Sequence, residues 1–219
     1  MDRSGRGADV KDVRQEQYQR KIHQALAALL RNQYRLVTTL PTINCERVLL
    51  RPLRTSDVDA IFTIFSNPKV MRYWSTPPLS DRNAAEMLTK KIVHDVELGS
   101  MMKWGVARMS DDTVVGTVTL FHIDLDNGRA ELGYALAQES WGQGYMGEAL
   151  RSLVDYTFNT LNLRRLEADV DPRNGASIRT LELLGFQREG FLRERWHVAG
   201  EIQDALFYGL LKREWQNSL

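Results

Sequence analysis

The spacing of apolar residues along the chain alternates between two periods, one typical of helices and the other of strands. Between residues 11 and 36, apolar side chains recur at steps of three and four with polar residues opposite, as in an amphipathic helix. The irregular stretch 38–46 then separates this helix from the rest of the chain. The helical period returns later and predicts helices over residues 55–67, 79–99, 144–161 and 174–185.

Alternating apolar and polar residues predict strands in the remaining segments. These segments are residues 47–53, 103–109, 114–124, 129–136, 164–171, 188–198 and 202–212. Short polar turns join the second, third and fourth of them, so we expect these three to pair as an antiparallel meander. The pattern indicates one α+β domain over residues 46–219. An N-terminal extension, residues 1–45 with its helix at about 11–36, precedes that domain.

The composition narrows the classes of function that the chain can serve. A net charge of +1 over 219 residues gives no broad electrostatic attraction to nucleic acid or to an anionic membrane. The one cysteine, Cys45, leaves no partner for an intrachain disulfide. The four histidines show no metal-ligand spacing, and no apolar run approaches the ~20 residues of a membrane span. We therefore expect a cytoplasmic protein with no metal and no nucleic-acid or membrane partner.

The stretch WGQGYMGEAL, residues 141–150, carries glycines with the spacing G-x-G-x-x-G. This spacing also occurs in dinucleotide-binding turns, and Glu167 lies 20 residues after Gly147, where such a site needs an acid for the ribose. However, the preceding strand ends near Leu136 and a polar loop intervenes. The motif also comes late in the chain, after a meander, and leaves too little chain for a doubly wound sheet. We therefore reject the dinucleotide interpretation.

The same glycines suit the diphosphate of a different cofactor. A loop that enters a helix presents several unpaired backbone N–H groups, and the helix dipole adds about half a positive charge there. Gly142 and Gly144 remove side chains that would block a diphosphate. The strands before and after the helix can splay apart to admit an extended thioester arm. These features describe a coenzyme A site.

Four stretches in order along the chain resemble the GNAT superfamily of acyl-CoA-dependent N-acyltransferases. Within it, the chain is closest to the branch of ribosomal-protein N-terminal (alanine) acetyltransferases. The resemblance covers about residues 44–215 and implies an α/β fold whose mixed central sheet is splayed between two strands. The stretches that carry it are ERVLLRPLRTSDVDAIFTIFSNPKVMRYW, AELGYALAQESWGQGYMGEAL, DPRNGASIRTLELLGFQREG and GEIQDALFYGL.

The resemblance implies where acetyl-CoA, as the cosubstrate, would bind. The pantetheine arm would pair with backbone groups of Tyr134, Ala135 and Leu136, and Asn174 would help to hold it. The backbone N–H groups that would hold the diphosphate belong to Gly142, Gln143, Gly144, Tyr145, Met146 and Gly147. Two positions depart from the general family loop: Trp141 stands at its first position, and Met146 stands where a small residue is usual.

Acetyl transfer to an amine needs a base, and the resemblance favours an acid on one of the two splayed strands. We prefer Glu131, because its apolar neighbours could raise its pKa, and we keep Asp169 as the second candidate. Glu194 on a later strand is a third. The alternative for the first two acids is a place on a solvated strand face, or a structural ion pair with one of the arginines Arg129, Arg164 and Arg165.

The leaving thiolate of CoA needs a hydrogen-bond donor or a proton. Asn174 and Ser177 match the family's N-x-x-S motif, in which the serine reaches the sulfur. The alternative is that both are ordinary helix-capping residues. Many relatives carry a tyrosine as general acid where this chain has Leu181. Because a thiolate with a pKa near 8.5 needs little help to leave, Ser177 or water would suffice.

The acceptor is the least determined part of the prediction. Deprotonation at pH 7 costs roughly 1.4 kcal/mol for an α-amine and about 4.6 kcal/mol for a lysine amine, so an α-amine needs only a modest base. We expect direct attack by a peptide or protein N-terminus in a ternary complex. The alternatives are a small-molecule amine, such as an antibiotic or polyamine, and a non-catalytic acyl-CoA-binding module. The N-terminal helix leaves a homodimer possible. Candidate walls of the acceptor groove are Tyr73, Trp74, Trp104, His122 and Trp196.

Overall fold

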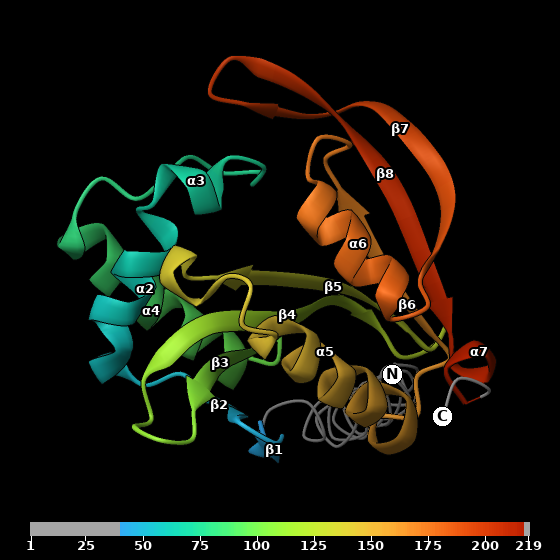
Figure 1. Ribbon diagram of the computed structural model, residues 1–219, viewed down its shortest axis with the longest axis horizontal. Helices are drawn as coiled ribbons and strands as arrows, with labels where there is room; N and C mark the ends of the chain where they lie inside the picture. Colours follow the sequence, from blue (N-terminus) through green and yellow to red (C-terminus); the bar gives the residue numbers. More distant parts are fainter. Residues whose placement is uncertain (1–39, 217–219) are drawn as a thin grey trace, which may run out of the picture. The chain divides into compact units, whose positions relative to one another are not determined.

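The computed structural model describes residues 40–216, so the helix expected over residues 11–36 lies outside the described residues. Within this range eight strands form one sheet: β1 (Ile43–Asn44), β2 (Val48–Pro52), β3 (Met102–Arg108), β4 (Val114–Asp124), β5 (Arg129–Leu136), β6 (Arg165–Val170), β7 (Gln187–Val198) and β8 (Glu201–Leu211). The helices are α2 (Val58–Phe65), α3 (Pro68–Met71), α4 (Arg82–Glu97), α5 (Tyr145–Asp155), α6 (Gly175–Leu183) and α7 (Lys212–Gln216). Figure 1 shows their arrangement.

The strand order in the sheet is β1-β2-β3-β4-β5-β6-β8-β7. Strands β3, β4 and β5 pair antiparallel, which confirms the expected meander. β5 and β6 are the parallel neighbours, because α5 carries the chain back along the sheet between them. β6, β8 and β7 then pair antiparallel. The mixed α+β architecture expected from the sequence is therefore confirmed.

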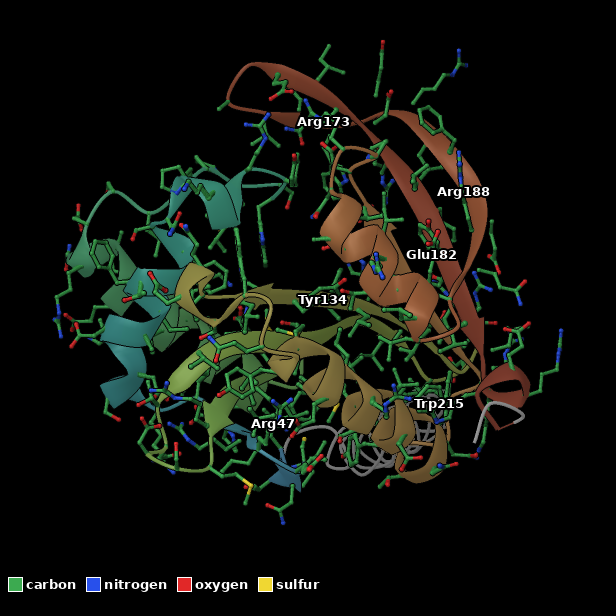
Figure 2. All side chains as sticks on the ribbon, in the orientation of Figure 1. Arg47, Tyr134, Arg173, Glu182, Arg188 and Trp215 are labelled. Atoms are coloured by element: carbon green, nitrogen blue, oxygen red, sulfur yellow. The ribbon has the colours of Figure 1, made fainter. Side chains whose placement is uncertain are left out.

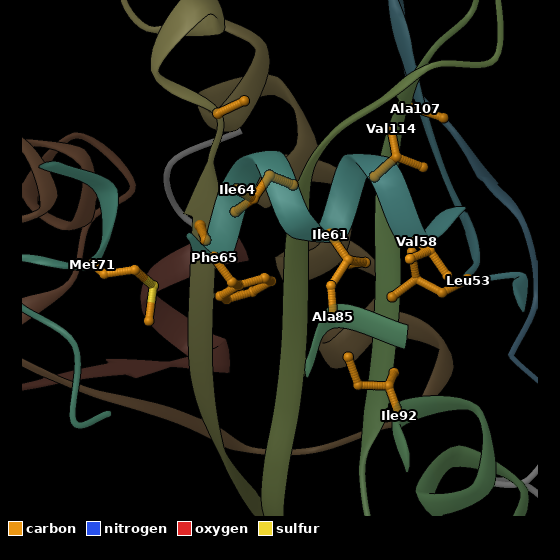
Figure 3. Packing of buried hydrophobic residues seen from close by; sticks show 12 residues of the cluster. Leu53, Val58, Ile61, Ile64, Phe65, Met71, Ala85, Ile92, Ala107 and Val114 are labelled. Atoms are coloured by element: carbon orange, nitrogen blue, oxygen red, sulfur yellow. The ribbon is translucent and has the colours of Figure 1, made fainter. Parts of the chain in front are cut away.

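Helices cover both faces of the sheet, and each buries a stripe of apolar side chains. On one face α2 and α4 pack together over the sheet, with Val58, Ile61, Ile64 and Phe65 of α2 directed into the core (Figure 3). α5 covers the other face, and its buried residues Met146, Ala149, Leu150, Leu153 and Val154 recur at helical spacing. Burial of each large apolar side chain contributes roughly 1.5–3 kcal/mol.

Several short elements were not predicted from the sequence. β1 and α7 are short, and α3 is a single turn that begins at Pro68, directly after the helix predicted over residues 55–67. The long helix over 144–161 divides into α5 and a π-helical turn, Tyr156–Thr160. None of the helices within residues 40–216 is long and apolar enough to cross a membrane.

Candidate functional site

The central feature of the site is a gap between β5 and β6. Their parallel pairing runs from Arg129 opposite Arg165 only as far as Glu131 opposite Glu167. Beyond this point, residues 132–136 of β5 keep their β4 partners but have no partner on β6. Figure 1 shows the β6–β8–β7 part of the sheet turning away, with α6 beside the opening. The gap therefore leaves one edge of β5 available to a ligand.

A cavity of about 550 Å³ lies at the glycine-rich loop and extends into this gap. Gly142 and Gly144 have φ angles of +73° and +82°, a region that side-chain-bearing residues rarely adopt. A Cβ at Gly142 or at Gly147 would meet nothing within 4 Å. The backbone at the start of α5 is therefore uncovered, as a diphosphate site at a helix N-terminus requires. The cavity is lined by the predicted residues Tyr134, Ala135, Leu136, Gly142, Gly144, Met146, Gly147, Asn174 and Ser177. Of the predicted cofactor-binding residues, Gln143 and Tyr145 do not line it.

Arg47, which precedes β2, holds the glycine-rich loop in place. Its guanidinium donates hydrogen bonds to the carbonyl of Gln143 and to the Glu148 carboxylate, each at 3.0 Å. Partial burial disfavours ionised Glu148, but N–H donors of Arg47 and Val48 and the guanidinium more than offset this and lower its pKa. A Cβ at Gly144 would lie 3.1 Å from Arg47 Nη2. We missed Arg47 because about 100 residues separate it from the loop.

The two departures from the family loop have structural explanations. Trp141 Nε1 donates a hydrogen bond of 2.8 Å to the carbonyl of Leu136, which ties the loop to the end of β5. Met146 is buried and its terminal methyl lies over Gly116 of β4, where an added Cβ would be 3.3 Å away. The large side chain thus fits beside a residue that has none.

A second cavity of about 540 Å³ adjoins the gap and contains the two predicted base candidates. Glu131 Oε1 lies 2.8 Å from His122 Nδ1. His122 sits at an irregularity in β4 with a φ angle of +47°, a strained conformation of the kind that clusters at functional sites. The Glu131 side chain is 19% exposed, and the His122 side chain is 68% exposed. The carboxylate is thus shielded, while its partner faces solvent.

The arginine partners anticipated for the two acids were wrong. Asp169 contacts Arg195 at 3.4 Å, whereas Arg129 and Arg165 both bind Glu167. The third base candidate, Glu194, is also absent from the lining of this cavity. Its own N–H instead donates to Asp204 at a bulge of β7.

Asn174 and Ser177 line both cavities, which therefore meet beside them. Asn174 Oδ1 accepts a hydrogen bond of 3.2 Å from the Ser177 N–H, so Asn174 caps α6 as expected. Across the gap, the Tyr134 hydroxyl donates to the carbonyl of Ser177 at 3.3 Å, and Figure 2 places Tyr134 on β5 near α6. Burial raises the pKa of Tyr134 to about 12, so the phenol stays protonated at neutral pH.

Four of the five residues expected to line the acceptor groove do line this cavity: Tyr73, Trp74, His122 and Trp196. Trp104 was wrongly included. It is fully buried on the other face of the sheet, where its ring meets Tyr156 edge to face. The alternation of β3 explains the error, because Trp104 and its neighbour Lys103 point to opposite faces.

Lys103 is one of the residues of this cavity that sequence reasoning missed, as are the acids Asp171 and Asp204. It lies in β3, is 9% exposed and lines the cavity. Its Nζ lies 5.1 Å from the ring centroid of Phe65. Desolvation lowers the pKa of Lys103 from 10.5 to about 8. The signal in the sequence was a lysine at the start of a strand whose next four residues, 104–107, are apolar or glycine.

The described part of the chain holds no group of three or more His, Cys, Asp or Glu side chains that could bind a metal. The site instead consists of an uncovered helix start, an opened strand edge and an adjoining pocket with carboxylates. These features can hold an anionic, extended ligand in one cavity and present a second molecule to it from the other.

Comparison with known proteins gives consistent matches. The model of the family described as "Acetyltransferase (GNAT) domain" matches residues 47–187. An uncharacterized N-acetyltransferase, p20 of Bacillus licheniformis, is 37% identical over 177 residues, 80% of this chain and 99% of the relative. The putative ribosomal N-acetyltransferase YdaF of Bacillus subtilis is 37% identical over 106 residues, 48% of this chain and 58% of the relative.

A solved structure extends the comparison to a protein with bound ligands. The spermidine N-acetyltransferase from Vibrio cholerae, in complex with CoA and spermine, superposes with a TM-score of 0.69 at 27% identity. The superposition covers 78% of this chain and 99% of that protein. The named relatives therefore include both ribosomal and polyamine enzymes.

Proposed function

Because this chain belongs to the GNAT family of acetyltransferases, we propose that it transfers acetyl from acetyl-CoA to the α-amine of a peptide or protein N-terminus. The observation that carries the proposal is the early end of the β5–β6 pairing at Glu131 and Glu167. Beyond the last paired residues, two cavities meet at the same edge of β5. One accommodates the cosubstrate and the other the amine.

The uncovered backbone of the loop and of α5 suits the diphosphate of acetyl-CoA. N–H groups of residues 142–147 would bind its oxygens, helped by the positive end of the helix dipole. The pantetheine amides would pair with β5 at residues 134–136, which have no β6 partner. The thioester supplies the acetyl group, and backbone N–H groups of β5 would stabilise the charge that develops on its oxygen.

Glu131 is the base in this proposal. It removes a proton from the attacking amine, directly or through a water molecule. His122 is a positioning residue that fixes the carboxylate by its contact of 2.8 Å. Asp169 remains the second candidate, because it lines the same cavity and its contact with Arg195 is long, at 3.4 Å.

The departing thiolate would lie near the start of α6. Ser177 faces both cavities, and its hydroxyl would donate to the sulfur. The Tyr134 hydroxyl donates a hydrogen bond to the Ser177 carbonyl, and this contact connects β5 to α6 across the gap. Tyr134 would therefore hold the two walls of the site at a fixed separation.

The choice of an N-terminal acceptor is supported by the likeness to YdaF, which is named as a putative ribosomal N-acetyltransferase. A polyamine is the second candidate. It is favoured by the similar spermidine enzyme and by the acids that line the acceptor cavity, Glu131, Asp169, Asp171 and Asp204.

An acceptor panel tests the proposal. Acetyl-CoA consumption would be followed with peptides that have a free N-terminal amine, the same peptides with a blocked N-terminus, spermidine and an aminoglycoside. We expect turnover with the free peptides and none with their blocked counterparts. Turnover confined to spermidine or to the aminoglycoside would refute the N-terminal acceptor, and acetyl-CoA binding without turnover on any amine would refute catalysis.

A further inference from the structure

Lys103 is a buried cation on the floor of the acceptor cavity, and no carboxylate of residues 40–216 pairs with it. Among residues 40–216, neither a hydrogen bond nor an ion pair satisfies its Nζ, and the Phe65 ring at 5.1 Å is the contact found. A buried ammonium without a hydrogen-bond acceptor is costly. Because Lys103 lines the cavity, a ligand there could supply the missing acceptor.

The sheet register places Lys103 on the same face as the proposed base. Lys103 lies opposite Thr119, and Thr119 lies opposite Gly133. Directly opposed residues share a face, and so do residues two apart on one strand, so Glu131 belongs to the same face. The backbone positions of Lys103 and Gly133 are two strand spacings apart, roughly 10 Å. An amine at Glu131 therefore has Lys103 on the far side of the same pocket floor.

The acids that line this cavity are each engaged by another group of the protein. Glu131 contacts His122, and Asp169 contacts Arg195. Asp171 binds Arg173 at 2.6 Å. Asp204 accepts the N–H of Glu194 at 2.7 Å. Arginines thus balance the charge of Asp169 and Asp171, while Glu131 and Asp204 are held by a histidine and a backbone N–H.

We propose that Lys103 is a specificity-determining residue that donates a hydrogen bond to the carbonyl oxygen adjacent to the acceptor's amine. This inference rests on the proposed function, and it narrows the acceptor to amines that carry such an oxygen, as every peptide N-terminus does. A polyamine offers further cations in place of the oxygen, and the ammonium would repel them. The same positive charge favours the neutral, nucleophilic form of the bound amine.

A matched pair of small acceptors isolates the carbonyl group. Alaninamide and isopropylamine differ in that the first has a carboxamide where the second has a methyl group. We would measure kcat/KM for both with the wild-type enzyme and with Lys103→Met, which keeps the apolar stem and removes the charge. For each enzyme we would divide kcat/KM for alaninamide by kcat/KM for isopropylamine. Dividing the ratio of the variant by that of the wild type cancels the different basicity of the two amines.

We expect Lys103→Met to reduce the preference for alaninamide at least about tenfold, which corresponds to ~1.4 kcal/mol. Calorimetry on the enzyme–CoA complex should show a similar loss of affinity for an alanine-initiated peptide, with unchanged affinity for acetyl-CoA. Lys90→Met is the matched control, since Lys90 is exposed on α4 and pairs with Glu86. Its acceptor ratio should equal that of the wild type.

The possible failures are distinguishable. If the wild type acetylates α-amines but the acceptor ratio and peptide affinity are the same in Lys103→Met, the role of Lys103 is refuted and the proposed function stands. If the wild type acetylates spermidine and no α-amine, both the proposed acceptor and the role of Lys103 are refuted. Should the variant not fold, equal wild-type affinities for alaninamide and isopropylamine, corrected for their protonation, would still overturn the role.

Discussion

Glu131 Oε1 lies 2.8 Å from His122 Nδ1, across the two strands that form the floor of the acceptor cavity. The contact exists because β4 is irregular between Phe121 and Asp124, where His122 adopts a φ angle of +47°. In a regular ladder, the residue after Phe121 would point to the opposite face from Glu131. The irregularity thus provides the proposed base with a fixed partner.

We predict that Glu131→Gln lowers kcat/KM by about a hundredfold or more, because the amide cannot accept the proton of the amine. Asp169→Asn is the matched control, since it makes the same chemical change on the other side of the gap. It should leave kcat/KM nearly unchanged. Steady-state rates over a range of peptide concentrations give kcat/KM and decide between the two acids, and the reverse order of effects would assign the base to Asp169.

His122→Ala should reduce kcat/KM less than Glu131→Gln does, because the carboxylate remains but loses the partner that orients it. The pH–rate profile should change as well, because the carboxylate loses its contact of 2.8 Å with the histidine. Acetyl-CoA affinity should not change. An unchanged rate and profile in His122→Ala would show that the contact has no part in catalysis.

Gly147→Val tests whether the diphosphate of acetyl-CoA binds in the open space at the start of α5. The added side chain meets no protein atom within 4 Å at its Cβ, and glycine is itself a poor helix former, so the melting temperature should not fall. If the diphosphate binds there, affinity for acetyl-CoA should fall at least about tenfold, ~1.4 kcal/mol. Unchanged affinity by calorimetry would place the diphosphate elsewhere.

Arg47→Met should weaken acetyl-CoA binding by loosening the loop between Gln143 and Glu148. Because the Arg47 side chain is 51% exposed, we expect little effect on the free energy of unfolding. Arg54→Met is a suitable control: Arg54 is similarly exposed, at 58%, and pairs with Asp112 away from the loop. Equal affinities for acetyl-CoA in the two variants would argue against a role for Arg47 in forming the loop.

Lys103→Met should raise the free energy of unfolding by an amount that depends on pH. Burial lowers the pKa of Lys103 to about 8 from 10.5, so the folded protein releases this proton more readily than the unfolded chain. The free-energy cost of burying the charged Lys103 in the folded protein is thus fully present below pH 8. This cost is lost as pH rises from about 8 to 10.5, and its upper bound is about 3.4 kcal/mol at 1.36 kcal/mol per pKa unit. Denaturant unfolding should show the advantage of the variant shrinking across this window, and a constant advantage would contradict the pKa shift.

The strands and long helices were predictable because each has a clear period. The β3–β4–β5 meander follows from apolar alternation and short turns, and α5 follows from its buried stripe. Local sequence also identified the glycines and the Asn174 cap. Contacts between distant segments were not predictable. Arg47 meets Glu148 across 101 positions, and no local pattern records that pairing.

The face of the sheet to which a side chain points was the second feature that the sequence did not predict. Trp104 was expected in the acceptor groove, but it is buried on the opposite face. Lys103 beside it was overlooked, although it lines the cavity. In a strand buried on both faces, both neighbours are shielded and alternation no longer marks the functional face. The register with β4 and β5 was needed to separate them.

A crystal structure of the acetyl-CoA complex tests the central claim most directly. The diphosphate should contact backbone N–H groups of residues 142–147. The pantetheine arm should run along residues 134–136, in the gap beyond Glu131 and Glu167, with the acetyl group facing the cavity that contains Glu131. Acetyl-CoA bound away from this gap, or β5 and β6 paired along their full length in the complex, would contradict the account.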